Sequence, residues 1–465
     1  MTRFLLLLLL AGCSVGPDYK RPEVETPAAY KEAGNWKPAE PRDAAARGKW
    51  WAMFGDAQLD GLMAQVDISN QTIAAAEAQL RQATALTAQS RAGWWPTVTG
   101  TLQATRSKPS QTTGPVIGTT ATKRTIYSAP LNASWEADLW GKVRRAVESG
   151  EASEQASAAD LVNARLSVQS ELAQSYFQLR ALDSQKKLLD ESVAAYAKTL
   201  ELTMNRYNVG VVSRADVAQA ETQLQSTRAQ ALDVGLQRAQ LEHAIAVLLG
   251  KPAANFALES AVDPRSLAAA PPPVPAAGLP AELLERRPDI AAAERRMAAA
   301  NAQIGVAKSA WFPAATLSAT YGVQSATTQN WFTLPSRFWS IGPALALTLF
   351  DGGRRAAVSD QAVASYDQSV ATYRGTVLTA FKEVEDNLAA LRVLEEEAAV
   401  QGEAVKAAQL ALDISLNQYR AGIITFLQVV QAQTAALSNQ RAALDVQSRR
   451  VAASVLLVKA LGGAW

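Results

Sequence analysis

The chain reads Met204-Asn205-Arg206-Tyr207-Asn208-Val209-Gly210 at one point and, 212 residues later, Leu416-Asn417-Gln418-Tyr419-Arg420-Ala421-Gly422. Each copy ends a stretch of more than sixty residues without a proline, which starts at Gly141 in one case and at Gly353 in the other. As a single helix, either stretch would be roughly 95 Å long at ~1.5 Å per residue. The glycine suits a turn after a helix, and each chain segment then runs back, to Leu249 and to Leu461. No compact core needs helices this long, so two long helical hairpins decide the fold.

The rest of the chain is duplicated as well. Leu139–Ala146 matches Leu349–Ala356, and Trp94-Trp95-Pro96 matches Trp311-Phe312-Pro313. Three pairs of markers keep the same order and nearly the same offset. This indicates a tandem duplication of about 210 residues rather than a short-period solenoid.

Apolar residues in the long stretches recur at separations of three, four or seven, as in a coiled coil. The first hairpin shows this in Leu161, Val168, Leu172, Leu179, Leu182, Leu189, Val193, Tyr196 and Leu200. The second shows it in Phe381, Val384, Leu388, Leu391 and Leu394. The pattern predicts helices packed on helices with polar outer faces, and no stretch is apolar enough for a transmembrane helix.

Each half also contains two segments in which apolar and hydroxyl side chains alternate. They run over about 97–105 and 127–138 in the first half, and 315–321 and 340–349 in the second. Alternation with period two predicts strands with one apolar face. Four strands of this kind suit a β-barrel of the outer membrane but cannot close one, because the smallest closed membrane barrels have about eight strands. Lipid forbids an open sheet edge, so several chains would have to share one barrel. The alternative that the residues leave open is a water-soluble β-layer.

The ends and the middle of the chain divide it further. Residues 1–12 resemble a signal peptide, and Leu10-Ala11-Gly12-Cys13 resembles a bacterial lipoprotein processing site with Cys13 as the acylated residue. We expect a proline-rich extended arm over 13–55, a first repeat over 56–250, a linker over 251–280 and a second repeat over 281–465. A helix is expected from about Asp56 to Ala92, ahead of the first strand. The net charge of +2 gives no reason to expect nucleic-acid binding.

These features resemble the TolC-type outer-membrane factors, in the lipoprotein (NodT-like) subgroup that serves resistance-nodulation-division (RND) efflux pumps. The most specific match is Leu279–Ile290, which contains Arg286-Arg287-Pro288-Asp289, and further matches are Val15–Tyr19 and Leu461–Trp465. The resemblance covers nearly the whole chain. It implies a mainly helical fold with a small β part, in which a homotrimer forms a helical barrel and a shared twelve-stranded transmembrane β-barrel. It also implies a lipid-anchored channel in the bacterial outer membrane, reaching into the periplasm toward an adaptor (membrane fusion) protein and an inner-membrane RND pump.

The turns of the two hairpins are the candidate functional site. Gly210 and Gly422 suit helix termination in any case. The resemblance adds adaptor docking at residues around both turns: Arg206, Tyr207, Gly210, Val211, Tyr419, Arg420, Gly422 and Ile423. It also implies a periplasmic gate at this end, and Asp216 and Tyr419 match positions that link neighbouring helices there. Ile424 replaces a polar family position, so we expect an apolar constriction at Ile423 or Ile424, assisted by Asp216 and Arg420.

No pattern in the sequence predicts catalysis, a cofactor or a metal. The sole histidine, His243, lies within a helix and has no cysteine beside it in a ligand spacing. No glycine-rich phosphate loop follows a strand. We therefore expect a protein that is not an enzyme.

The expected function is the passive exit duct of a tripartite pump for drugs or other small toxic molecules. Metal-ion efflux and type I protein secretion are the alternatives within the same architecture, and a periplasmic coiled coil without a channel is a structural alternative. An aqueous duct need not recognise its cargo, so the substrate does not follow from the residues.

Overall fold

The computed structural model describes residues 15–24, 26–27, 29–31, 48–108, 110, 123–260, 284 and 286–463. The expected signal peptide, Cys13 and most of the linker lie outside this part of the chain. In chain order the elements are η2 Trp50–Phe54, α2 Ala57–Ser69, α3 Gln71–Ala92, β1 Thr97–Gly100, β2 Gln103–Ser107, β3 Arg124–Ala137, α4 Lys142–Asn208, α5 Arg214–Leu248, η3 Ala253–Asn255, α8 Pro288–Ser309, β4 Ala314–Ser325, η4 Leu334–Ser336, β5 Arg337–Ala346, α9 Arg354–Arg420 and α10 Phe426–Ala460.

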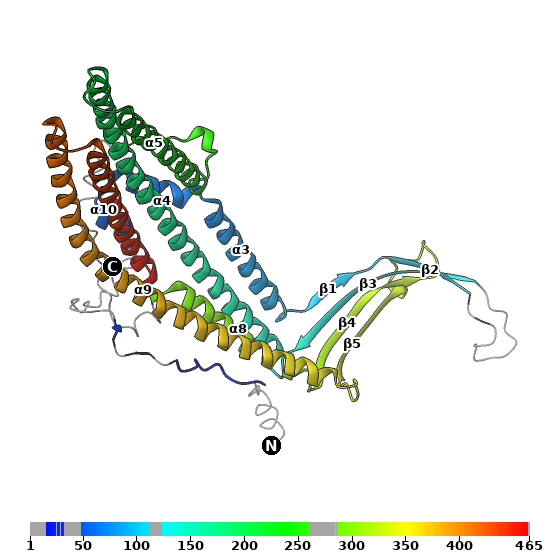
Figure 1. Ribbon diagram of the computed structural model, residues 1–465. Helices are drawn as coiled ribbons and strands as arrows, with labels where there is room; N and C mark the ends of the chain where they lie inside the picture. The colour runs from blue at the N-terminus through cyan, green and yellow to red at the C-terminus, as the bar shows by residue number, and fades with distance from the viewer. Residues whose placement is uncertain are drawn as a thin grey trace. The chain divides into compact units, whose positions relative to one another are not determined.

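The two long helical hairpins predicted from the repeat are present. α4 and α9 have 67 residues each, and α5 and α10 have 35 residues each (Figure 1). Within the described residues, no helix combines the length and the apolar composition needed to cross a bilayer. The chain divides into two compact units, one of 1–23, 79–158 and 292–373 and the other of 24–78, 159–291 and 374–465. Both repeats therefore contribute to both units.

The first unit contains one antiparallel sheet in the order β1-β3-β4-β5, with β2 also paired to β3 (Figure 1). The pairs Gly100–Leu131 and Gln103–Ser128 belong to the same register, so β1 and β2 are one strand with a short interruption. The interruption lies opposite Pro130. Thr101 N donates to Pro130 O at 3.0 Å, but Pro130 has no N–H to donate in return. The four strands predicted from alternation are thus present.

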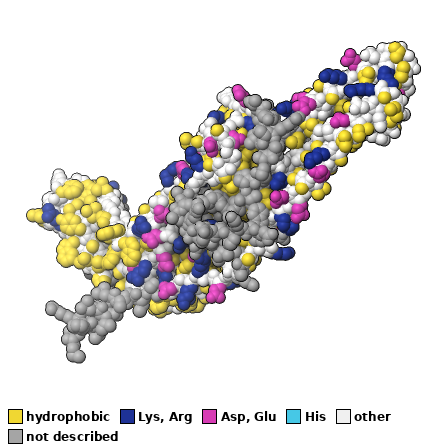
Figure 2. Space-filling view, turned by 90° about the vertical axis from the view of Figure 1, so that its left-hand side faces the viewer, with side chains coloured by type: hydrophobic (Ala, Val, Ile, Leu, Met, Phe, Trp, Pro, Cys, Tyr) yellow, Lys and Arg dark blue, Asp and Glu magenta, His cyan; other side chains and the backbone are white. Residues whose placement is uncertain are grey.

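One face of the sheet is apolar. In β5, Trp339, Ile341 and Leu345 alternate with smaller or polar residues and are 63–75% exposed. In the space-filling view, hydrophobic side chains predominate on the lobe that holds the sheet, whereas acidic and basic side chains are interspersed over the helices (Figure 2). A contiguous exposed apolar surface of this kind normally contacts another molecule or a membrane.

An aspartate shortly before each long helix binds its first N–H groups, although the two aspartates are not at matching positions of the repeat. Asp138 Oδ1 and Oδ2 accept from the backbone N of Val143 and Arg144, both at 2.9 Å. In the second half, Asp351 Oδ2 accepts from Arg355 N at 3.2 Å. These contacts satisfy N–H groups that have no partner within the helix, and they fix where each helix leaves the sheet.

The helix expected from Asp56 to Ala92 is two helices, α2 and α3, so that expectation was wrong at one point. The chain is extended at Asn70, with φ −70° and ψ 127°. Asn70 Oδ1 accepts from the N–H groups of Thr72 and Ile73, and its Nδ2 donates to Leu248 O at 2.7 Å. The side chain thus starts α3 and ties the break to the end of α5. The asparagine breaks the helix although apolar residues continue on both sides of it, because its side-chain amide competes with the helical hydrogen bonds of the backbone.

The second unit holds the largest apolar core. It packs Trp50 and Trp51 of η2 and the buried face of α2 against α4 and the ends of α5 and α10. Leu172 and Tyr176 on α4 are almost fully buried in it. The coiled-coil spacing predicted for α4 therefore corresponds to a buried face.

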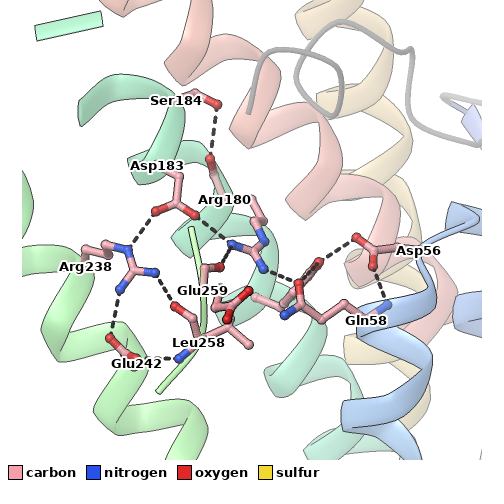
Figure 3. A network of polar contacts seen from close by, with 10 residues as sticks. Asp56, Gln58, Arg180, Asp183, Ser184, Arg238, Glu242, Leu258 and Glu259 are labelled. Carbon is pink, nitrogen blue, oxygen red and sulfur yellow. Dashed lines mark hydrogen bonds and ion pairs between the residues drawn. The ribbon is translucent and has the colours of Figure 1, made fainter. Parts of the chain in front are cut away.

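Next to this core lies a buried network of charged groups (Figure 3). Asp183, whose side chain is 2% exposed, accepts from Arg180 Nη1 and from Arg238 Nε, both at 2.7 Å. Arg238 also donates to Glu242 at 2.8 Å and to the carbonyl of Leu258 at 2.5 Å. The network joins α4, α5 and the segment after η3. Because every charge in it has an opposite partner, it holds these elements in one register.

Candidate functional site

The turn of the first hairpin is built by a glycine and a capping box. Gly210 has a φ of +78°, and Val211 N donates to Arg206 O at 2.9 Å, which ends α4. Ser213 Oγ accepts from Asp216 N at 3.3 Å, while Asp216 Oδ2 accepts from Ser213 N at 2.9 Å. This reciprocal pair starts α5 at Arg214, directly after the turn.

The second hairpin ends its first helix in the same way as the first hairpin does, but it starts its second helix without a capping box. Gly422 has a φ of +77°, and Ile423 N donates to Gln418 O at 2.9 Å. Thr425 precedes α10 but makes no side-chain capping bond. The two turns, Val209–Ser213 and Ala421–Thr425, are called the tips below, and the second is held less tightly by its own residues.

The two tips are joined within one chain by Arg206 and Tyr419. The Arg206 guanidinium lies 4.7 Å from the centroid of the Tyr419 ring, and its Nη1 donates to Tyr419 O at 2.6 Å. Tyr419 is 2% exposed and packs on Phe426 with ring centroids 5.4 Å apart. Thr203 Oγ1 lies 3.5 Å from the Tyr419 hydroxyl. These contacts link the end of α4 to the end of α9.

The expected docking residues fall into two groups. Val211 and Ile423 are 60% and 72% exposed, and Tyr207 is 42% exposed, so each tip presents apolar surface. Arg206 and Tyr419 instead face one another and form the link between the hairpins. The glycines shape the turns, with nothing near Gly210 that an added Cβ would meet.

Of the expected gate residues, Ile424 and Tyr419 belong to one apolar cluster, whereas Asp216 bonds within its own turn. The carboxylate of Asp216 is occupied by Ser213 of its own tip. Ile424 is half-buried against the apolar cluster of Tyr419, Phe426 and Val429. Tyr419 also contacts Arg206, which lies 213 residues away in sequence. No local sequence pattern identifies this contact.

The N-terminal arm is docked on the first unit by a close backbone approach. Gly16 has a φ of +109°, and a Cβ there would lie 2.6 Å from Gly305 Cα on α8. Arg145 Nη2 donates to Asp18 Oδ1 at 2.9 Å, and the Arg145 side chain is 5% exposed. Val15 N donates to Trp140 O at 3.2 Å. The chain is therefore fixed to the base of the sheet within two residues of Cys13.

The segment that carries the strongest resemblance is a structural joint. Arg287 donates to both oxygens of Asp289 at 3.0 and 2.6 Å, to Glu383 at 2.7 Å and to Ala460 O at 3.0 Å. Burial opposes the charged form, but the hydrogen bonds to Asp289 and Glu383 raise the pKa of Arg287 above its ordinary value. Gly462 lies against Arg286, since a Cβ there would be 2.8 Å from Arg286 O. The segment ties the start of α8 to α9 and to the end of α10.

No metal site is present among the residues that the structure describes, in the sense of three or more His, Cys, Asp or Glu side chains gathered around one point. The polar contacts of the tips, the arm and the joint are all accounted for by packing and chain reversal. What remains available for function is surface: the apolar face of the sheet and the exposed tips.

Known proteins resemble this chain over almost its whole length. The sequence model of the outer membrane efflux protein family matches residues 62–251 and 279–463. The pyoverdine export outer membrane protein OpmQ of Pseudomonas aeruginosa is 34% identical over 98% of this chain and 95% of its own length. The toluene efflux pump outer membrane protein TtgC of Pseudomonas putida is 33% identical over 100% of this chain and 96% of its own length.

The solved structure of the outer-membrane channel OprN superposes with a TM-score of 0.85 and 29% identity, covering 97% of this chain and all of OprN. The expected fold class is confirmed, because channels of this fold combine a helical barrel with a β-barrel built by a trimer. The resemblance drawn from the sequence is confirmed as well. The family model alone spans well over half of the residues, and the chain belongs to the outer membrane efflux protein family.

Proposed function

We propose that three copies of this chain form the exit duct of a tripartite RND-type efflux pump, which conducts small toxic molecules passively from the periplasm to the exterior. The β-sheets of the three copies close one barrel in the outer membrane. The helical hairpins line the periplasmic part of the duct.

The observation that carries this proposal is the sheet. β1 with β2 forms one edge and β5 the other, and neither edge has a second partner among the described residues. One face is apolar and exposed. An apolar sheet with two open edges is stable in lipid only if further strands cover the edges, and three times four strands reach the number that a closed barrel needs.

Exposed apolar side chains on α9 support the same assembly. Leu378, Val393, Val400, Leu410 and Ile414 are 47–73% exposed in the single chain. Long helices with large apolar side chains on an outer surface are typical of subunits that pack on copies of themselves. The expected homotrimer would cover part of this surface.

The exposed tips support an adaptor partner. Val209, Val211 and Ile423 offer apolar side chains on turns that are closed by backbone hydrogen bonds, and the first turn is also fixed by its capping box. Rigid apolar turns suit docking of a partner protein with little loss of conformational entropy. We assign the periplasmic gate to the same end, with Ile423 and Ile424 as the apolar constriction and Asp216, Tyr419 and Arg420 beside it.

The docked arm supports a lipid anchor at Cys13. Since Val15 is bonded to the base of the sheet, an acyl chain on Cys13 would enter the membrane next to the barrel wall. The lipid anchor and the barrel would then hold the protein at the same depth in the membrane.

For the cargo we propose small organic molecules. The two relatives are named for pyoverdine export and for toluene efflux, and the described residues contain no group of metal-ligating side chains that would favour ions. Metal-ion efflux remains an outcome that the experiment below distinguishes.

The test has two parts. Protein purified in detergent should be trimeric by light scattering and should give single-channel conductance in planar bilayers. A deletion strain should become more sensitive to solvents and hydrophobic antibiotics, and plasmid-borne wild-type protein should restore resistance. A monomer without conductance contradicts the duct, and sensitivity restricted to metal salts contradicts the cargo.

A further inference from the structure

The sheet carries its basic and its acidic residues at opposite ends. Glu136 of β3 lies at the end next to α4, where it pairs with Lys142, and the basic residues lie at the other end. From Thr97 to Trp135 and from Ala310 to Phe350 the sequence contains no Asp or Glu. The basic residues in these two segments are Arg106, Lys108, Lys123, Arg124 and Arg337. All five are exposed and lie at the strand ends that are connected by the β2–β3 and β4–β5 loops. This is the end of the sheet opposite to the starts of α4 and α9.

The strand register separates the five by face. Arg337 is paired with Val323, and it alternates along β5 with Trp339, Ile341 and Leu345 on the apolar face. Arg106 is paired with Thr125, which lies two residues from Tyr127 on the same face. Side chains directly opposite one another share a face, so both arginines border the apolar face.

Arg124 lies on the other face. It is paired with Ser107, one residue out of phase with Arg106. In a barrel this face lines the lumen. Arg124 therefore has the same charge and a similar position along the sheet, but it points away from lipid.

Aromatic side chains mark the level of the two arginines. Tyr127 and Trp331 have ring centroids 5.6 Å apart, and Phe332 and Trp339 are more than 70% exposed. From Arg337 to Leu345 the strand extends ~26 Å at ~3.3 Å per residue. A tilt of about 40° reduces this to roughly 20 Å of depth, which is close to the apolar band of an outer-membrane barrel between its aromatic girdles. The arginines then lie at the level of the lipid headgroups.

We propose that Arg106 and Arg337 bind the phosphate groups of the glycolipid that forms the outer leaflet of the bacterial outer membrane. This rests on the proposed function, because the helices must face the periplasm for this end of the sheet to face outward. Both arginines are exposed, and neither forms an ion pair with another residue in the part of the chain that the structure describes, so both guanidiniums can bind an anion. Guanidinium binds phosphate through two parallel hydrogen bonds, and a diphosphorylated headgroup offers more than one such acceptor.

Closure of the proposed barrel would strengthen the site. Arg106 is on one edge strand and Arg337 on the other, so the edges of neighbouring copies bring an Arg106 and an Arg337 to the same seam. Each of the three seams would carry a pair of lipid-facing arginines. Lys108 and Lys123 add positive charge around them without an acidic residue nearby in the sequence.

The test measures binding of purified diphosphorylated lipid A to the detergent-solubilised full-length protein by native mass spectrometry. Wild type should bind it, and R106Q/R337Q should bind at least about tenfold more weakly, since charge-assisted hydrogen bonds are lost. R124Q, which removes the same charge from the lumen face, should bind as wild type does. Equal binding by R106Q/R337Q and wild type overturns the proposal.

Two further arms keep the outcome decisive. Wild type should lose binding to lipid A from which the phosphates have been removed, a result that does not depend on any variant folding. Phosphatidylglycerol bound as tightly as lipid A would overturn the assignment to the glycolipid. Conductance and trimer mass are recorded for wild type and for every variant. If the proposed function is wrong, wild type itself shows no conductance, and this result is separate from lipid binding.

Discussion

Arg206 at the end of α4 covers the ring of Tyr419 at the end of α9, with the guanidinium carbon 4.7 Å from the ring centroid. Its Nη1 also donates to the Tyr419 backbone carbonyl at 2.6 Å. One side chain thus joins the two hairpins of a chain at the end where we place the gate. A charge-assisted hydrogen bond contributes roughly 1.5–3 kcal/mol and a partly exposed cation–π contact about 0.5–1 kcal/mol.

Replacing Arg206 by alanine should therefore loosen the contact between the two hairpins at this end. These contacts together are worth more than about 1.4 kcal/mol, which changes an equilibrium tenfold, so we expect the open probability in planar bilayers to rise by at least about tenfold. Arg214→Ala is the matched control, because it removes an exposed arginine from the same tip. Equal open probabilities for the two variants would show that the Arg206–Tyr419 contact does not hold the gate.

Much of the fold could be predicted because its signals are local and periodic. Stretches without proline that begin near Gly141 and Gly353 gave helices that begin at Lys142 and Arg354. Period-two alternation located all four strands, although the missing N–H of Pro130 interrupts one of them on its partner. The helix break at Asn70 was missed because the helical spacing of apolar residues continues across it. The side-chain amide of Asn70 alone determines that the backbone leaves the helical conformation there.

The candidate site was less predictable, because its contacts join distant residues. By resemblance, Asp216 and Tyr419 are expected to link neighbouring helices. Within one chain Tyr419 contacts Arg206, and Asp216 caps its own helix. Pairing across the two hairpins depends on how the helices are rotated about their axes, which no local pattern determines. The buried joint at Arg287 was visible only as a motif, without its partners Glu383 and Ala460.

Asp183 is expected to be essential for the stability of the second unit. Asp183→Ala would leave Arg180 and Arg238 without the carboxylate that they share, and loss of one partner from a buried ion pair costs about 3–5 kcal/mol. Thermal unfolding in detergent should shift to clearly lower temperature. Asp233→Ala is the control on the same hairpin, since Asp233 is exposed and its carboxylate accepts from Gln237 Nε2 at 2.7 Å on the same helix. Unfolding of both variants at one temperature would contradict a stabilising role for the network.

The close approach of Gly16 and Gly305 should control whether the arm stays docked. In Gly305→Ala the new Cβ would lie 2.7 Å from Arg145 Cγ and 2.9 Å from Val15 O, so the arm or Arg145 must move. Limited trypsin digestion should then cut after Lys20 at least severalfold faster than in wild type. Gly61→Ala, where an added Cβ meets nothing, should not change the rate. An unchanged rate in Gly305→Ala would mean that Arg145 yields and the arm does not depend on this contact.

Adjacent residues of β5 offer the sharpest test of a membrane-embedded sheet. Ile341 is 63% exposed on the apolar face, and Ser340 is exposed on the opposite face. A lysine on the lipid face of a barrel near mid-depth costs roughly 2–4 kcal/mol, whereas a lysine facing the lumen remains in water. Ile341→Lys should therefore greatly reduce the amount of folded trimer in outer-membrane fractions, measured on semi-native gels. Ser340→Lys should keep the trimer and change ion selectivity in bilayers. The reverse pattern would mean that the apolar face of the sheet lines the lumen, and equal amounts of trimer would mean that neither face contacts lipid.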